Sequence, residues 1–105
     1  MDSGFGALEL AIRVARLVHQ LLDRVDIKYL VDQGRRAMDS VVLNLAEGRG
    51  RRGADRARFY RTAYASAQET VAVVRLVTMR RDVNVDEVLA ALDRLCAVTW
   101  VLHRR

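Results

Sequence analysis

Six arginines lie within thirteen residues near the middle of the chain, in a segment that also holds two glycines. From Arg49 to Arg61 the only acid is Asp55, so this segment carries a formal charge of +5, equal to that of the whole chain. Guanidinium groups bind phosphate through paired N–H donors, and glycines let backbone amides approach a phosphate closely. The segment predicts a contact surface for a nucleic-acid backbone, either RNA or DNA, with Tyr60 as the candidate for base stacking and these basic residues: Arg49, Arg51, Arg52, Arg56, Arg58, Arg61.

Two other interpretations of this arginine segment stay open. It could dock an acidic protein, which would make the chain a scaffold or adaptor with no nucleic-acid role. It could also be a solvated charged face, as most charge runs are. The nucleic-acid interpretation is favoured because a helix is expected to begin here, and the dipole at a helix N-terminus attracts anions.

The glycines from Gly48 to Gly53 match the G-x-G-x-x-G pattern of dinucleotide-binding proteins. That pattern needs a preceding strand and a surrounding βαβ unit, whereas a helical pattern precedes it here. We therefore expect a hinge that carries arginines and no bound cofactor.

Residues that could ligate a metal or act as nucleophiles are few. His19, His103 and Cys96 form no H-x-x-E arrangement with an acid, and Cys96 sits in an apolar seam. Glu47 and Glu69 could approach each other across two helices, but the Glu-x-x-His partners of a di-iron site are missing. We expect no metal and no enzymatic activity, the alternative being an active site completed between subunits.

The elements that must position these residues are all predicted to be helical. The chain has no proline, and its apolar fraction of 51% suits a single domain with one core. Apolar residues recur at helical spacing over about 7–25, 27–47, 54–80 and 85–103. Four helices with short connections predict an all-α, antiparallel up-down four-helix bundle spanning residues 1–105.

Residue types at the expected helix ends support these boundaries. Asp26 is expected to cap the second helix, and Asn84 with Glu87 forms a capping-box-like start for the fourth. Gly48 is expected to end the second helix with a positive φ angle. Phe59 is expected in the core seam of the third helix.

The first helix has two adjacent apolar stripes, for example Ala11 with Val18 and Val14 with Leu21. Their combined width is about twice that of a helix with one buried side. One stripe is expected inside the subunit and the other against a second chain, unless the helix is simply central in the bundle.

A polar row follows the second helix at spacings of three and four, and it consists of Gln33, Arg36, Ser40, Asn44 and Glu47. Such a row is either the solvent boundary or a set of hydrogen bonds across a helix interface. The pattern alone leaves both interpretations open.

The chain is expected to be cytoplasmic and not to contact membranes. Residues 1–6 lack the basic start of a signal peptide, and no apolar run approaches the roughly 20 residues of a membrane span. The single cysteine, Cys96, excludes an internal disulfide framework and suits a reducing compartment.

Two segments resemble a known family. Residues 33–48, QGRRAMDSVVLNLAEG, and residues 58–69, RFYRTAYASAQE, are similar to the signature of the 23S rRNA intervening-sequence proteins, also called four-helix-bundle proteins. The likeness covers about residues 8–103. It departs from the usual pattern at Ala65, where a glycine is common, and at Val42, where a proline is common.

This resemblance implies a four-helix bundle that assembles into a closed homo-oligomeric ring, expected to be a homopentamer. Accessory proteins of diversity-generating retroelements are similar in architecture and bind nucleic acid and a reverse transcriptase through basic surfaces. Most matching positions are expected to be structural, serving as cap, hinge and interhelix hydrogen bonds: Arg36, Ser40, Asn44, Glu47, Gly48, Phe59, Ser66, Glu69.

Overall fold

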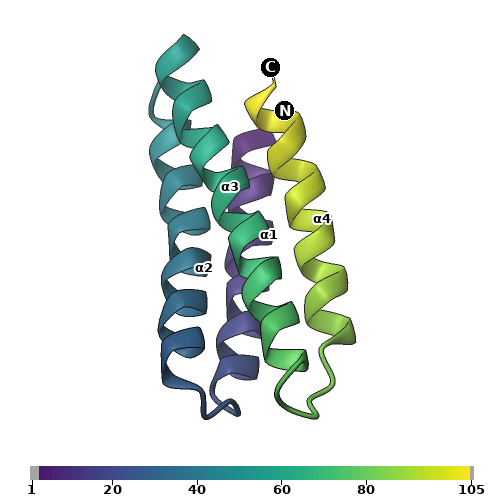
Figure 1. The fold of residues 1–105 in the computed structure, drawn as a ribbon. Coiled ribbons are helices and arrows are strands. Elements are labelled where there is room, and N and C mark those ends of the chain that lie inside the picture. Colours follow the sequence, from purple (N-terminus) through teal and green to yellow (C-terminus); the bar gives the residue numbers. More distant parts are fainter. Residues whose placement is uncertain (1–2, 105) are drawn as a thin grey trace.

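Four helices make up the part of the chain that the computed structural model describes, residues 3–104, apart from the side chain of Ser3. They are α1 (Ser3–Leu22), α2 (Lys28–Arg49), α3 (Gly53–Thr78) and α4 (Asp86–His103). The all-α prediction is confirmed, with helix ends a few residues from those expected. Figure 1 shows the four helices side by side, joined by short connections at the two ends of the bundle.

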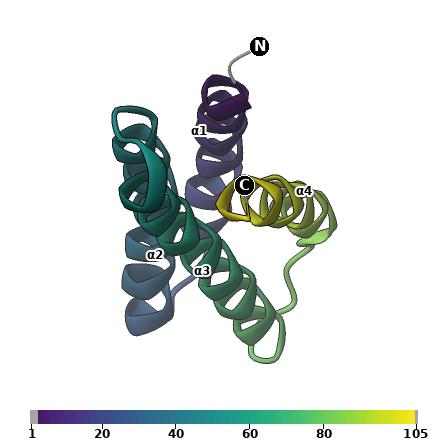
Figure 2. The same cartoon turned by 90° about the horizontal axis from the view of Figure 1, so that it is seen from above.

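Neighbouring helices run in opposite directions. His19 and Asp23 of α1 bind Asp39 and Arg35 of α2 respectively, so the residue number rises along one helix as it falls along the other. Viewed from above in Figure 2, α1 and α3 lie across from each other, with α2 and α4 between them. Accordingly, α1 packs on α2 and α4, and α3 packs on the same two helices.

The core explains both apolar stripes of α1. Ala11 and Val18 of one stripe and Val14 and Leu21 of the other are all buried within the subunit. Because α1 packs on two helices, both stripes have partners in the same chain. The width of this apolar surface is therefore no sign of a second chain.

Two of the expected helix caps differ from the structure. Asp26 does not cap α2, whose N-cap residue is Ile27 without a side-chain hydrogen bond. Instead Asp26 accepts a hydrogen bond of 2.7 Å from Arg81, which joins the first and third connections. Asn84 accepts a hydrogen bond of 3.0 Å from the Asp86 amide, although α4 takes Val85 as its N-cap residue.

The expected end of α2 at Gly48 is wrong. The helix continues through Gly48 to Arg49, and Gly50 follows as the C-cap residue with a φ of −84°. Among the described residues the positive φ, 58°, belongs to Gly53 at the start of α3. The connection is therefore short, and its left-handed residue opens the next helix instead of closing the previous one.

None of the helices described in residues 3–104 combines the length and the apolar character that crossing a lipid bilayer requires.

Candidate functional site

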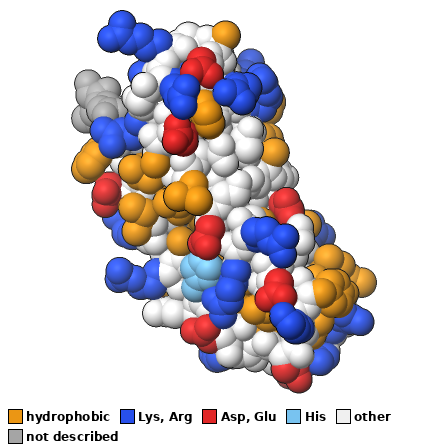
Figure 3. Space-filling view, turned by 90° about the vertical axis from the view of Figure 1, so that its left-hand side faces the viewer, with side chains coloured by type: hydrophobic (Ala, Val, Ile, Leu, Met, Phe, Trp, Pro, Cys, Tyr) orange, Lys and Arg blue, Asp and Glu red, His pale blue; other side chains and the backbone are white. Residues whose placement is uncertain are grey.

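The arginine segment occupies the end of the bundle where α2 turns into α3. This turn reaches furthest at the top of Figure 1, and the chain termini lie at the same end. All six predicted arginines are exposed. Figure 3, which looks onto the α2 side, shows Lys and Arg side chains around this upper end with acidic side chains between them.

Two of the arginines are bound by carboxylates. Arg51 lies 3.2 Å from both Glu47 and Asp55, and Arg58 lies 3.1 Å from Asp55. The hydrogen bond from Arg58, with that from Arg51, lowers the pKa of Asp55. The Glu47 and Asp55 carboxylates in turn raise the pKa of Arg51. These two guanidinium groups are thus partly neutralised and held in place.

Arg56 holds the turn together. Its Nε donates to the Gly48 carbonyl at 3.2 Å and to the Arg51 carbonyl at 2.7 Å. The last carbonyls of a helix lack intrahelical donors, so a side-chain donor there completes the end of α2. Arg56 is therefore part of the turn's architecture more than of its outer surface.

Arg52 and Arg61 are the arginines of this segment with no hydrogen-bond or ion-pair partner among residues 3–104. Arg49, by comparison, lies over the Phe5 ring at 5.2 Å. A side chain without an internal partner has no protein contact to give up when it binds an external anion, and the cost is limited to its ordering and desolvation. Arg52 and Arg61 are the side chains that an anionic ligand could engage without breaking a contact.

The two aromatic residues of the segment exchange their expected places. Tyr60 is buried, only 5% exposed, and so cannot offer its ring to a base. Phe59, expected in the core, is half-buried under Arg51 and Arg58, whose guanidinium carbons lie 5.1 and 4.6 Å from its ring centroid. The cause is Gly48, since its lack of a side chain makes room for the Tyr60 ring.

The polar row of α2 meets α3 through hydrogen bonds. The Ser40 and Ser66 hydroxyls lie 2.8 Å apart, and Asn44 donates to the Ser40 hydroxyl at 3.0 Å. Gln33 donates to Glu69 in the same interface. Ser40 and Gln33 of this row therefore join α2 to α3, whereas the hydrogen bonds of Asn44 stay within α2. Arg36 of the same row is exposed.

No group of residues in the described range could hold a metal ion. Glu69 lies beside Gln33, and Gln33 and Glu47 are roughly 20 Å apart along α2, so the two glutamates do not meet.

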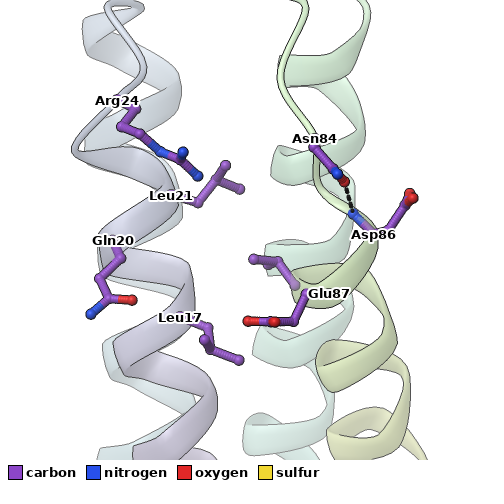
Figure 4. Close-up of a pocket in the computed structure, with 8 residues that line it drawn as sticks. Leu17, Gln20, Leu21, Arg24, Asn84, Asp86 and Glu87 are labelled. Atoms are coloured by element: carbon purple, nitrogen blue, oxygen red, sulfur yellow. Dashed lines mark hydrogen bonds between the residues drawn. The ribbon is translucent and has the colours of Figure 1, made fainter.

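A hollow of about 440 Å³ lies at the opposite end of the bundle, between α1 and α4 (Figure 4). Arg24 of α1 and Glu87 of α4 point into it from opposite walls, Gln20 and Asn84 also line it, and the Asp86 carboxylate points away from α1. Its mixed charge does not match a phosphate ligand, and it contains no histidine, cysteine or serine to act as a nucleophile.

One cluster was not anticipated from the sequence. The Tyr64 ring of α3 lies 5.2 Å from the rings of both Trp100 and His103 of α4, and Arg104 lies over Trp100 at 5.2 Å. The spacing of Trp100, His103 and Arg104, at three and four residues, is the signal that could have indicated a shared helix face. Their proximity to Tyr64 depends on how α3 and α4 pair, which no local pattern contains.

Comparison with protein families gives a match over almost the whole chain. A family model described as "23S rRNA-intervening sequence protein" matches residues 6–104. No curated protein matches the chain.

Proposed function

The chain belongs to the 23S rRNA-intervening sequence protein family, and on this premise we propose that it is a non-enzymatic, homo-oligomeric bundle that binds nucleic-acid backbone. Binding takes place at the turn between α2 and α3. This binding is independent of base sequence, because the arginines there contact phosphates.

The proposal rests on a difference among the arginines: some bind other groups of the turn, and others have no internal partner among residues 3–104. Arg51, Arg56 and Arg58 are held by carboxylates and carbonyls, which fixes the shape of the turn. Arg52 and Arg61 project from that fixed support without an internal partner. The N-terminus of α3 lies between them and adds a favourable dipole for anions.

The outer face of α2 and α3 supports self-association. The apolar stripes of α1 do not, because they are buried within the subunit. A hollow of about 450 Å³ there is lined by Tyr29, Leu30 and Leu76 among others, and Met79 nearby is 78% exposed. Figure 3 shows exposed apolar side chains on this side of the molecule. Large exposed apolar areas typically mark interaction surfaces. In an assembly of several copies, several weak sites would contact the same nucleic acid, and the overall affinity would exceed that of a single site.

The test compares two double variants that lose the same charge. Arg52→Ala with Arg61→Ala removes the arginines proposed to bind phosphate, and Arg24→Ala with Arg75→Ala removes two exposed arginines at the opposite end. We expect the first variant to weaken binding of mixed-sequence RNA and DNA. It should also reduce the log–log salt slope by about 1 to 2, as expected for two lost phosphate contacts. The second variant should bind like the parent chain.

Three outcomes contradict this proposal. Binding that is absent or independent of salt would exclude a backbone contact. Equal losses in both variants would mean that net charge, and not this turn, governs binding. A protein partner that stays bound after nuclease treatment, without any nucleic-acid affinity, would make the chain an adaptor. The assembly is tested separately by light scattering, where a monomer mass would refute the homo-oligomer.

A further inference from the structure

The cluster formed by Tyr64, Trp100, His103 and Arg104 presents an aromatic surface to solvent. Trp100 is 42% exposed although it packs on Tyr64 from one side and edge-on against His103, at 4.8 Å, from another. Two rings thus hold the indole in one orientation while part of it stays open. A rigid, half-exposed indole suits stacking, since little freedom is lost when a flat ligand lies on it.

A shallow hollow of about 300 Å³ adjoins this ring. It is lined by Tyr64, Gln68, Cys96, Ala97 and Trp100. Gln68 donates one hydrogen bond to the Tyr64 hydroxyl at 2.9 Å. A side-chain amide has two N–H donors and a carbonyl acceptor, so it retains capacity for a further polar partner. The hollow therefore offers a flat apolar wall with a polar group beside it. A nucleobase is complementary to such a surface, because it is a flat ring with hydrogen-bonding groups at its edge.

This surface is continuous with the arginine turn. Arg61, Tyr64 and Gln68 follow one another on α3 at spacings of three and four, so they lie on one face within roughly 10 Å of helix. Arg104, the C-cap residue of α4, lies over the Trp100 ring at 5.2 Å, so a base that stacks on this face displaces its guanidinium toward the neighbouring phosphate. Positive charge thus borders the rings on two sides.

A negative charge stands near the hollow on α4, because Asp93 comes one helical turn before Cys96. Burial, followed by the charge of Asp93, raises the pKa of the Cys96 thiol. Asp93 would repel a phosphate, so a nucleic-acid strand that enters the hollow must keep its backbone toward Arg61 and Arg104.

We propose that Trp100, supported by Tyr64, stacks an unpaired base of single-stranded RNA or DNA, while Arg61 and Arg104 bind the flanking phosphates. This inference rests on the proposed function and adds the form of nucleic acid that is bound. In a duplex the base faces are covered by their neighbours, so only a single strand can use the ring. The surface consequently selects single strands over duplexes without reading their sequence.

The native chain carries its own probe, because Trp100 is its only tryptophan. We expect oligothymidylate and oligouridylate to quench its fluorescence, and a matched duplex to quench it much less. Inorganic polyphosphate carries the same charges without bases. It should compete for binding yet leave the emission unchanged.

Variants separate stacking from charge. Trp100→Leu should weaken binding of a dye-labelled oligothymidylate by between about 5-fold and 100-fold, as for one lost stacked base, and leave polyphosphate binding unchanged. Trp100→Phe should restore most of the affinity. Ile12→Ala is the control, because Ile12 is also 42% exposed but lies on α1, which contributes no residue to this hollow or to the surface proposed for self-association.

The outcomes distinguish this inference from the function on which it rests. If oligonucleotides bind in a salt-dependent way without quenching Trp100, stacking is refuted and backbone binding stands. If neither oligonucleotides nor polyphosphate bind, the proposed function fails and stacking fails with it. If Trp100→Leu lowers the solution mass, the face joins two copies of the chain and the stacking inference is overturned. Should Trp100→Leu fail to fold by circular dichroism, the quenching of the native chain decides.

Discussion

The ring of Tyr60 lies against the backbone of Gly48, so closely that a Cβ atom at residue 48 would be 2.4 Å from Cε1 of the ring. Both residues are buried, directly behind the arginine turn. The contact fixes the last turn of α2 to the first turns of α3. It also explains a glycine inside a helix, where glycine costs about 1 kcal/mol relative to alanine.

Gly48→Ala should therefore change stability in opposite directions in two backgrounds. In the parent chain it forces the Tyr60 ring to move, and the free energy of unfolding should fall by about 1–3 kcal/mol. In a Tyr60→Val background the clashing ring atoms are gone, and the same change should raise that free energy by about 1 kcal/mol. Urea denaturation of the four chains measures both effects. A loss in both backgrounds would show that Tyr60 is not the obstacle.

The hydroxyl pair of Ser40 and Ser66 should show strong coupling. Ser66→Ala leaves the half-buried Ser40 hydroxyl with one partner fewer, so the free energy of unfolding should fall by about 1 kcal/mol. Ser40→Ala with Ser66→Ala removes both ends of the bond and should cost less than the sum of the single changes. Additive losses in this cycle would mean that the hydroxyls do not bond in solution.

Acid should loosen the arginine turn through Asp55. Because its pKa is lowered by Arg58 and Arg51, the folded chain binds a proton at Asp55 less readily than the unfolded chain. The carboxylate thus stabilises the fold fully above its unfolded pKa of about 3.9, and this contribution disappears as the pH falls through the lower folded value.

Asp55→Asn should accordingly make the unfolding midpoint less dependent on pH below about pH 4 than in the parent chain. Asp82→Asn, which removes an exposed acid without an ion pair among residues 3–104, should keep the steeper dependence. Thermal unfolding between pH 2.5 and pH 7 measures both. Parallel curves for the parent and Asp55→Asn would contradict the effect.

Cys96 should react slowly with alkylating reagents. Burial, and then the charge of Asp93, raises the pKa of its thiol, and the thiolate is the reactive form. At pH 8 the native chain should react with iodoacetamide more slowly than the urea-unfolded chain, and Asp93→Asn should react faster than the parent. Equal rates for native and unfolded chains would show that the thiol is not protected.

The helices themselves follow from the sequence because their signals are local. Apolar residues at helical spacing, together with the absence of proline, are enough to predict four helices and a bundle. Their ends are less certain, because tertiary contacts can extend a helix. Gly48 has the residue type of a helix end, yet the Tyr60 ring packs against it and α2 continues to Arg49.

The side chains at the site depend on contacts that no local pattern records. Phe59 and Tyr60 are adjacent and differ by about 100° around α3, so either could face the core. The space above Gly48 decides in favour of Tyr60. Likewise Tyr64 and Trp100 meet only because of the way α3 pairs with α4. A charge count predicts the arginine cluster, but it does not distinguish Arg56, which closes the turn, from Arg61, which is unpaired.

The order in which the helices pack has a consequence for how the chain folds. Three of the four helix pairs, α1 with α2, α2 with α3 and α3 with α4, join neighbours along the chain, and only α1 with α4 brings distant segments together. Proteins dominated by such local contacts fold within microseconds to milliseconds. We therefore expect the hairpins to form first and the α1–α4 seam to close last. That seam, where the hollow of Figure 4 lies, should also be the first part of the bundle to exchange its amide hydrogens.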